Sequence, residues 1–251
     1  MKNYNSKLIS CLFVNKVFHH RSNNYGNFVL DTELMNNINI PRVIDKDVAF
    51  NELKILKYIF DRFNIVFFLT HGSCLGAVRE KDFISHDHDL DIGCYKDDLD
   101  KIILAVHELE EEYKFKILKL SLDDESIAII KNNVILDISL FKTDGVNWQS
   151  NKDKIFTIPY IFLETLNEIE FLGIKLNVPN NTKDYFIYQY GIDWDTSIRN
   201  FYCPYRKKIE LPIKKLLSFI FGVKIALKIA QKVSKLVKYC MLWTKSRSKS
   251  I

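Results

Sequence analysis

Acidic residues recur at every second position in one short stretch, Ser85 to Ile92, whose sequence is SHDHDLDI. Asp89 and Asp91 are two residues apart, so on a β-strand their side chains project from the same face. Two such carboxylates suit a hard divalent cation, because Mg²⁺ and Mn²⁺ prefer oxygen ligands and leave positions for water and phosphate. The spacing therefore predicts a Mg²⁺ or Mn²⁺ site at Asp89 and Asp91.

Two further features fit this chemistry. Asp137 lies inside the apolar run VILDISL, where an acid is costly to bury unless it is paired or binds a metal. Gly72 and Ser73 form a turn after the apolar run NIVFFL, and there a backbone amide can approach a phosphate. Asp89, Asp91 and Asp137 on neighbouring strands would form one metal site for phosphoryl transfer. The alternative is that the acid-rich stretch is solvated surface.

The histidines offer a second metal hypothesis. HDHDLD resembles the H-x-H-x-D opening of metallo-β-lactamase-type hydrolases, in which His and Asp bind zinc. Such a site needs more histidines further along the chain, but His107 is the last of the six. The hard-cation site is therefore the better hypothesis.

The elements that must position these residues follow from hydrophobic periodicity, and they alternate between helix and strand, which predicts an α/β or α+β fold. Helices are expected at 46–63, in a short segment after the Gly-Ser turn, at 97–112, and at 181–191 with Gly191 as its stop. Strands are expected at 64–70, 89–95, 113–120, 125–131 and 133–141, with a strand or hairpin arm at 168–179.

Composition places the chain among globular proteins. It has 251 residues, 47% hydrophobic and 27% charged, which is enough to bury a core. Its five cysteines are scattered without a CxxC pair, so we expect a reducing compartment. The first 20 residues have only a short, interrupted apolar run, so no signal peptide is expected there.

Charge is unevenly distributed along the chain. Residues 205–251 carry 13 Lys or Arg and one Glu, a net charge of +12; since the whole chain is +5, the first 204 residues carry −7. Within this tail, lysines gather on one side of a helix over 223–241, and apolar residues gather on the other. This pattern predicts a helix that lies on an anionic membrane surface, or one that docks on the acidic body or a partner. The wide apolar face and the acidic body disfavour nucleic-acid binding.

Several motifs, in order, resemble one family. The run FFLTHGSCLGAVREKDFISHDHDLDIG is similar to the signature GTLLGAVRxxGFIPWDDDIDIG of LicD/fukutin-type phosphotransferases, which belong to the nucleotidyltransferase superfamily. LDISLF resembles the strand that bears the family's third acid, and FLGIKLNVPNNTKDYFIYQYGIDW resembles its closing pattern. The resemblance covers residues 48–204.

The resemblance implies a nucleotidyltransferase-like mixed sheet flanked by helices. It implies that Gly72 and Ser73 bind phosphate, with Arg79 of GAVR on a diphosphate. Asp89, Asp91 and Asp137 would be the metal-binding and catalytic acids, and Asp137 would share the metal or accept the acceptor hydroxyl's proton. A supporting role is expected for Asp87, and a role in shaping the site for the closing motif of Tyr190, Gly191, Asp193 and Trp194.

The implied reaction moves a phospho-alditol, phosphocholine or similar group from a CDP-activated donor to a hydroxyl of a glycan or lipid-linked glycan, releasing CMP. It would serve assembly of surface polysaccharide or another glycoconjugate, such as capsule or lipopolysaccharide, at the cytoplasmic face of the inner membrane. The sequence departs from the signature at four positions, which concern the donor or acceptor pocket: Asp82 for Gly, Ser85 for Pro, His86 for Trp and His88 for an acid.

Two other functions remain open on this fold. One is a nucleotidyltransferase that moves a nucleotide to a small molecule or sugar phosphate. The other is a non-catalytic glycan- or partner-binding domain. The expected organisation is an N-terminal extension over 1–45, a catalytic domain over 46–204, and the basic amphipathic helix and tail over 205–251.

Overall fold

The computed structural model describes residues 27–28, 43–121, 125–150, 157–191 and 194–196. The predicted basic helix and almost all of the predicted N-terminal extension lie outside these residues. The chain divides into two compact units. The described part of the first runs from Asn27 to Tyr160 and adds Glu168–Val178; the second contains Ile161–Asn167 and continues from Pro179. Each unit is described by itself.

The first unit is built on a mixed sheet, as predicted. Eight of the ten described strands follow the order β1-β4-β5-β6-β3-β2-β10-β9, and β7 and β8 extend from β6 as a separate ladder. β3 and β6 run parallel, as do β2 and β10, whereas β2 and β3 are antiparallel. The strands are β1 (Asn27–Phe28), β2 (Phe67–Leu69), β3 (Asp89–Tyr95), β4 (Lys116–Ser121), β5 (Ser126–Lys131), β6 (Val134–Thr143), β7 (Asn147–Gln149), β8 (Thr157–Pro159), β9 (Leu166–Phe171) and β10 (Ile174–Pro179).

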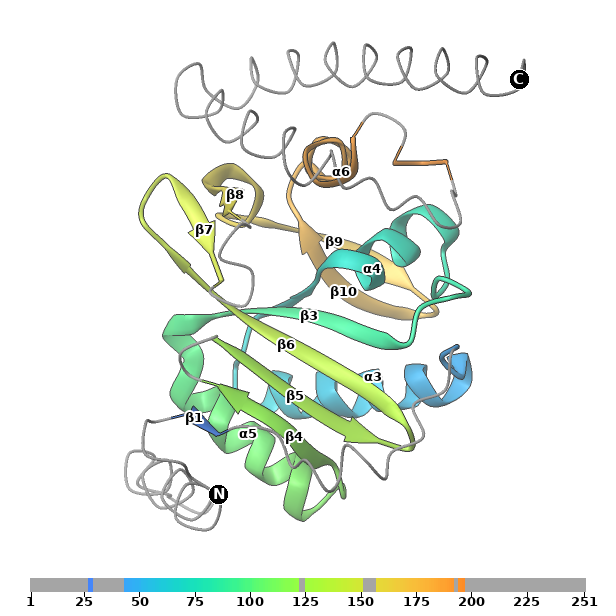
Figure 1. The fold of residues 1–251 in the computed structure, drawn as a ribbon, viewed down its shortest axis with the longest axis vertical. Coiled ribbons are helices and arrows are strands. Elements are labelled where there is room, and N and C mark those ends of the chain that lie inside the picture. The colour runs from blue at the N-terminus through green and yellow to red at the C-terminus, as the bar shows by residue number, and fades with distance from the viewer. Residues whose placement is uncertain (1–26, 29–42, 122–124, 151–156, 192–193, 197–251) are drawn as a thin grey trace, which may run out of the picture. The chain divides into compact units, whose positions relative to one another are not determined.

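Two longer helices cover one face of this sheet, as Figure 1 shows behind β3, β6, β5 and β4. They are α3 (Lys46–Arg62) and α5 (Leu99–Glu111). The strand residues on this face are almost completely buried, among them Leu90, Ile92, Leu136, Ile138, Ile127 and Ile129. Alternate residues of the same strands, including Asp89, Asp91 and Asp137, therefore lie on the opposite face.

Helix α3 begins and packs as its sequence predicts. The Asp45 side chain accepts hydrogen bonds from the amides of Asp47 and Val48, each at 3.1 Å, which caps the first turn. Its buried side chains recur at helical spacing, and Phe60 meets Phe67 of β2 edge-on at 5.7 Å between ring centroids. The helix thus connects the apolar pattern of 46–62 to the covered face of the sheet.

The remaining helical segments are short, apart from α6 of the second unit. α4 (His71–Leu75) continues directly into a π-helical turn, η1 (Gly76–Glu80), and a 3-10 turn, η2 (Lys96–Asp98), precedes α5. The 3-10 turn η4 (Tyr160–Phe162) ends in the second unit, where the ring of Phe162 contacts Tyr185 of α6 (Thr182–Tyr190) at 5.8 Å. None of the helices in the described residues is long and apolar enough to span a bilayer.

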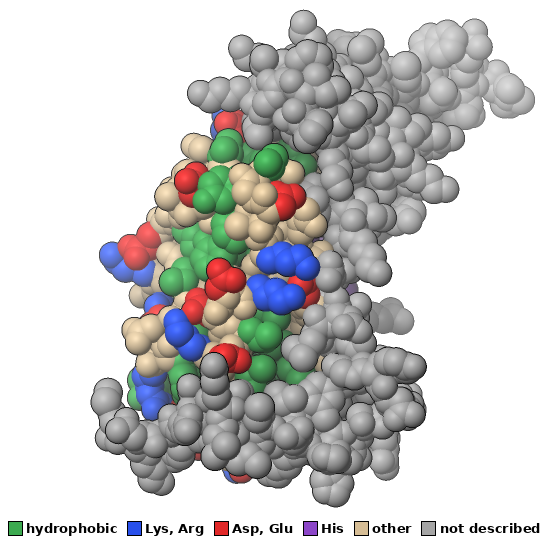
Figure 2. All heavy atoms as spheres, turned by 90° about the vertical axis from the view of Figure 1, so that its left-hand side faces the viewer, with side chains coloured by type: hydrophobic (Ala, Val, Ile, Leu, Met, Phe, Trp, Pro, Cys, Tyr) green, Lys and Arg blue, Asp and Glu red, His purple; other side chains and the backbone are tan. Residues whose placement is uncertain are grey.

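Figure 2 shows the face on the left of Figure 1, where described side chains of both charge signs alternate with hydrophobic ones. Elsewhere in the first unit, the buried carboxylate of Glu125 pairs with the ammonium groups of Lys96 at 2.5 Å and Lys142 at 2.8 Å. Opposite charges are thus paired locally, which satisfies a carboxylate that burial would otherwise destabilise.

The predicted elements agree with the structure over most of the described chain, with two omissions. The short strand β1, which pairs with β4, was not predicted within the N-terminal extension. The β7–β8 ladder was not predicted, because its strands are three residues long and half polar. Asp144 and Gly145 form the turn that starts it: the Asp144 carboxylate accepts hydrogen bonds from the Val146 and Asn147 amides at 2.9 and 2.7 Å. An Asp-Gly pair after a strand is a hairpin signal, and it was the clue available in the sequence.

Candidate active site

The Gly-Ser turn holds Asp91 in place. The Gly72 amide donates to Asp91 Oδ2 at 3.0 Å, and the Asp91 amide donates to Ser73 Oγ at 2.8 Å. A third bond joins the Thr70 amide to the Asp91 carbonyl at 3.1 Å. The turn therefore fixes both the backbone and the carboxylate of Asp91. The phosphate-binding role expected for Gly72 and Ser73 remains a prediction.

Gly72 is needed for space. An added Cβ at this position would lie 2.2 Å from Asp87 Oδ2 and 3.5 Å from Asp91 Oδ2. The left-handed backbone of the turn is instead at His71, whose φ is 41°. Glycine at position 72 therefore allows two carboxylates to approach the main chain closely.

Three carboxylates gather at this turn. Asp87, Asp89 and Asp91 are each half-buried, and each offers an oxygen within 4.8 Å of the others. Burial raises the pKa of Asp87 to about 6, with further contributions from the charges of Asp89 and Asp91. The hydrogen bond from the Ile44 amide to the Asp87 carbonyl, at 2.9 Å, anchors this acid beside the start of α3. Asp87, expected to have a supporting role, thus belongs to the cluster itself.

Asp137 lies on the neighbouring strand, level with Asp91. The two are directly paired in the parallel register of β3 and β6, so their side chains share one face of the sheet. Among the described residues, Asp137 is not one of the acids whose oxygens lie within 4.8 Å of one another. The structure therefore places Asp137 beside the cluster, but the tight group is Asp87, Asp89 and Asp91.

Arg79 ends up in a mostly buried position on η1. Its side chain is 13% exposed, and its Nη2 donates to Glu80 Oε1 at 2.6 Å. The π-helical turn that carries it starts at Gly76, where an added Cβ would lie 2.7 Å from the Asp82 carbonyl. π-Helical turns are frequent at functional sites. Binding of a diphosphate by Arg79 remains a prediction.

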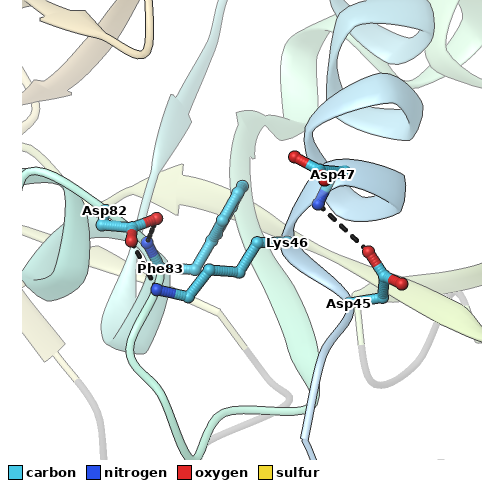
Figure 3. Close-up of polar contacts among 5 residues, drawn as sticks. All are labelled: Asp45, Lys46, Asp47, Asp82 and Phe83. Carbon is cyan, nitrogen blue, oxygen red and sulfur yellow. Dashed lines mark hydrogen bonds and ion pairs between the residues drawn. The ribbon is translucent and has the colours of Figure 1, made fainter.

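The structure gives Asp82, one of the four departures from the family signature, a structural role. Figure 3 shows its carboxylate between Lys46, at the start of α3, and the Phe83 amide, which donates to Asp82 Oδ1 at 2.7 Å. Burial acts to raise the pKa of Asp82, but these hydrogen bonds and the Lys46 charge outweigh it and lower the pKa. Asp82 thus ties the loop before the acid cluster to α3.

The closing motif lies in or beside α6 of the second unit. Gly191 ends the helix with a φ of 99°, and the ring of Trp194 contacts Phe186 at 4.7 Å, while Tyr190 contacts the same ring at 6.1 Å. Asp193 lies outside the described residues. These aromatic contacts are packing interactions within the second unit, so the expected site-shaping role stays a prediction.

The residues at the turn fit a divalent cation. Burial, and then the charges of Asp89 and Asp91, raise the pKa of Asp87, and a cation among these three half-buried carboxylates would relieve their repulsion. All the donors are carboxylate oxygens, which Mg²⁺ and Mn²⁺ prefer over the softer ligands of zinc. Asp87, Asp89 and Asp91 would hold the ion, which would offer its remaining positions to water and phosphate oxygens.

The curated relatives of this chain are transferases. It is 34% identical to ribitol-5-phosphate transferase FKTN of Mus musculus over 142 residues, which are 54% of this chain and 30% of that protein. It is 30% identical over 155 residues to the proteins of the same name from Macaca fascicularis and Homo sapiens, covering 59% of this chain and 33% of each. The chain thus spans about a third of the length of these relatives.

Among solved structures, the chain is similar to an antibiotic-resistance factor and to an antibiotic adenylyltransferase. One is the antibiotic-resistance factor ANT(2'')-Ia, with a TM-score of 0.44 and 11% identity, covering 81% of this chain and all of that one. The other is the lincosamide antibiotic adenylyltransferase LnuA, with a TM-score of 0.40 and 17% identity, covering 56% of this chain and 82% of that one.

The family comparison agrees with the resemblance seen in the sequence. Residues 64–181 match the model described as LicD/FKTN/FKRP, nucleotidyltransferase domain. This range includes the Gly-Ser turn, Arg79, the three-carboxylate cluster and Asp137. Over these residues the chain is therefore similar to the nucleotidyltransferase domain of the LicD/fukutin family.

Proposed function

We propose that this chain is a metal-dependent phosphotransferase that moves a phospho-alditol, such as ribitol phosphate, or phosphocholine or a similar group from a CDP-activated donor to a glycan hydroxyl. The observation that carries the proposal is the three-carboxylate cluster held by the Gly-Ser turn inside the matched family domain. The name of the FKTN relatives supports ribitol phosphate as the first group to test.

Each residue of the site would have a separate role in the proposed reaction. Asp87, Asp89 and Asp91 would hold Mg²⁺ or Mn²⁺, which when bound supplies positive charge to the donor's diphosphate. Gly72 and Ser73 hold Asp91 in the orientation needed for this. Asp137 shares the face of the sheet with Asp91 and would accept the proton of the acceptor hydroxyl as it attacks the phosphorus, while CMP leaves.

A screen of CDP-linked donors tests this proposal. The full chain is incubated with CDP-ribitol, CDP-glycerol or CDP-choline, a glycan acceptor panel, and Mg²⁺ or Mn²⁺, and CMP release is measured. We expect CMP release with at least one donor, abolished by EDTA and by Asp89→Ala in a folded protein. Transfer of a nucleotide from CTP to an acceptor, with no reaction of any CDP donor, would favour the nucleotidyltransferase alternative instead.

A folded Asp89→Ala variant that keeps full activity would contradict the assigned metal site. Absence of both reactions in the wild-type chain would favour the glycan- or partner-binding alternative. The three acids present at positions 87, 89 and 91 support catalysis over that alternative, because a binding domain does not need mutually repelling carboxylates at this turn.

We further propose that the enzyme works at the cytoplasmic face of the membrane, on a lipid-linked glycan acceptor. The support is the basic, amphipathic sequence of the tail, 13 Lys or Arg over residues 205–251. Flotation of the full chain with vesicles of phosphatidylglycerol and phosphatidylcholine tests it. We expect the chain to float with anionic vesicles and not with phosphatidylcholine alone; the same result after Lys→Gln changes along the tail would contradict the role of its charge.

A further inference from the structure

A β-bulge turns a lysine onto the face of the sheet that bears the acids. In the pairing of β4 with β5, Ile117 lies opposite Ile129, and the next pair is Lys119 opposite Ala128, so Leu118 is one extra residue on β4. Ile129 belongs to the face covered by helices, where it is fully buried. Without the extra residue Lys119 would share that face with Ile117, because residues two apart on a strand point the same way.

The pairing register then aligns two lysines with the acids. One cross-strand row runs from Asp91 to Asp137, Ala128 and Lys119. The row beside it runs from Asp89 to Ile135, Ile130 and Lys116. Each row therefore begins at an acid of β3 and ends at a lysine of β4, on the same face of the sheet.

The row from Asp91 to Lys119 is partly accessible, whereas the row from Asp89 to Lys116 passes through Ile130, which is buried. Ala128, Ile135 and Asp137 are half-buried, in contrast to the buried residues that alternate with them on the same strands. Ala128, the step between Asp137 and Lys119, has the smallest side chain that carries a Cβ. Among the described residues, Figure 1 shows no helix in front of β4, β5 and β6.

The distances suit a phosphate-bearing substrate. Neighbouring strands are about 4.8 Å apart, so the β4 backbone lies about 10 Å from β6 and about 14 Å from β3. The four-carbon stem of Lys119 spans part of this gap, and the anionic part of a substrate bound at the cluster would span the rest. Three acids on this face, with Asp87 beside them, repel a phosphate more strongly than one divalent cation offsets, so added positive charge favours binding.

We propose that Lys119, assisted by Lys116, binds a phosphate group of the substrate on the side remote from the metal-binding acids. The inference rests on the proposed function, since it names the anionic substrate of the same site. The phosphate has two possible sources, the distal phosphate of the CDP donor or a phosphate of the acceptor. Both present the same oxygens to a lysine ammonium group.

Isothermal titration of the full chain with CDP, CMP and inorganic phosphate, in the presence of Mg²⁺, separates these sources. If the donor is the source, Lys119→Ala weakens CDP binding about ten-fold or more and CMP binding less than about two-fold, because CMP lacks the distal phosphate. If the acceptor is the source, CDP binding is unchanged and binding of inorganic phosphate is weakened. The Lys116→Ala/Lys119→Ala double variant should lose more affinity than Lys119→Ala for whichever ligand, CDP or inorganic phosphate, the single variant binds more weakly.

Two variants control for structural effects. Lys119→Arg keeps the positive charge, so it should bind CDP and inorganic phosphate with most of the wild-type affinity. A purely structural role of the lysine stem would not predict this result. Lys175→Ala removes one positive charge from β10, where Lys175 is exposed and paired with Glu168 at 2.7 Å, and should bind all three ligands like the wild type. Circular dichroism and the melting temperature confirm that each variant is folded.

The two proposals fail in different ways. If wild-type and Lys119→Ala chains bind CDP and phosphate equally, the role of Lys119 is wrong and the proposed function is untouched. If the wild type binds phosphate through Lys119 but does not bind CDP, the CDP-donor function is wrong and the phosphate site stands. If the wild type binds neither ligand with Mg²⁺ present, both proposals are overturned.

Discussion

At the scale of single residues, the Asp87 carboxylate lies so close to Gly72 that it limits which side chains can replace the glycine. An added methyl group at Gly72 would lie 2.2 Å from Asp87 Oδ2, so the carboxylate must move away from Asp89 and Asp91. We expect Gly72→Ala to weaken Mn²⁺ binding about ten-fold, measured by isothermal titration, in a protein that remains folded. Gly145→Ala is the control, because an added Cβ there meets nothing within 4 Å, although its φ of 86° adds local strain. Unchanged Mn²⁺ affinity in Gly72→Ala would show that the Asp87 carboxylate does not contribute to the site.

Asp137 and Asp91 are paired on adjacent strands, but their substitution should affect Mn²⁺ binding and CMP release differently. Asp137 lies outside the tight group of oxygens, so Asp137→Asn should keep Mn²⁺ affinity within about three-fold. As the proposed acceptor of the hydroxyl proton it should still lose about 10²-fold or more in the rate of CMP release. Asp91→Asn should lose both properties. A large loss of Mn²⁺ binding in Asp137→Asn would instead make Asp137 a direct metal ligand.

At the scale of elements, the start of α3 supports the site indirectly. Asp45 caps this helix through two backbone amides, and the next residue before it, Ile44, hydrogen-bonds to the Asp87 carbonyl. Asp45→Ala should lower the free energy of unfolding by about 1 kcal/mol, measured by urea denaturation. Asp47→Ala, an acid in the same first turn that donates its amide to the cap, should cost only a few tenths of a kcal/mol. Equal losses in both variants would contradict the capping role of Asp45.

Elements with a strong hydrophobic period were predictable from the sequence, whereas those fixed by tertiary contacts were not. The helix over 46–63 and the strand over 89–95 have long periodic patterns, and the structure places them at Lys46–Arg62 and Asp89–Tyr95. The bulge in β4 has no periodic signal, since it depends on how Ile117 and Lys119 pair with another strand. The apolar pattern of KILKLS therefore predicts a strand but not which face each lysine occupies.

The residues of the site were also only partly predictable from the sequence. Asp89, Asp91 and Asp137 were identifiable because their spacing and apolar surroundings limit what the acids can do. Asp87 was predicted only to support the site and not to belong to the cluster. It lies before β3, and only the fold of the loop brings its carboxylate close to Asp89 and Asp91. Its signal in the sequence was its place in the alternating run SHDHDLDI.

At the scale of the whole molecule, metal-free stability should depend on pH through Asp87. Its pKa is about 6 in the folded chain against an ordinary value of 3.8, so between these values the folded state binds more protons than the unfolded state. Stability should therefore fall as pH rises from about 4 to 6 and not change further through this group above pH 6. A full shift of this size corresponds to about 3 kcal/mol, which solvent screening at this half-buried group reduces to about 1–2 kcal/mol.

Urea denaturation in EDTA between pH 4 and 8 measures this dependence. Asp87→Asn should remove that part of the fall and be more stable than the wild type at pH 7.5. Asp61→Asn, an exposed acid on α3 paired with Lys57 at 2.7 Å, should keep the wild-type profile in this range. If Asp87→Asn has the same pH profile as the wild type, burial and the neighbouring charges do not raise the pKa of Asp87 as the structure indicates.

The account depends most on the binding of one divalent cation by the acids of the Gly-Ser turn. Isothermal titration of Mn²⁺ into the metal-free full chain at pH 7.5 measures this directly, with the Asp89→Asn/Asp91→Asn double variant for comparison and Asp82→Asn as the matched control. We predict one bound Mn²⁺ per wild-type and Asp82→Asn chain, and loss of that ion in the double variant. Binding of Mn²⁺ with the same stoichiometry and affinity to the double variant, or no binding to the wild type, would contradict it.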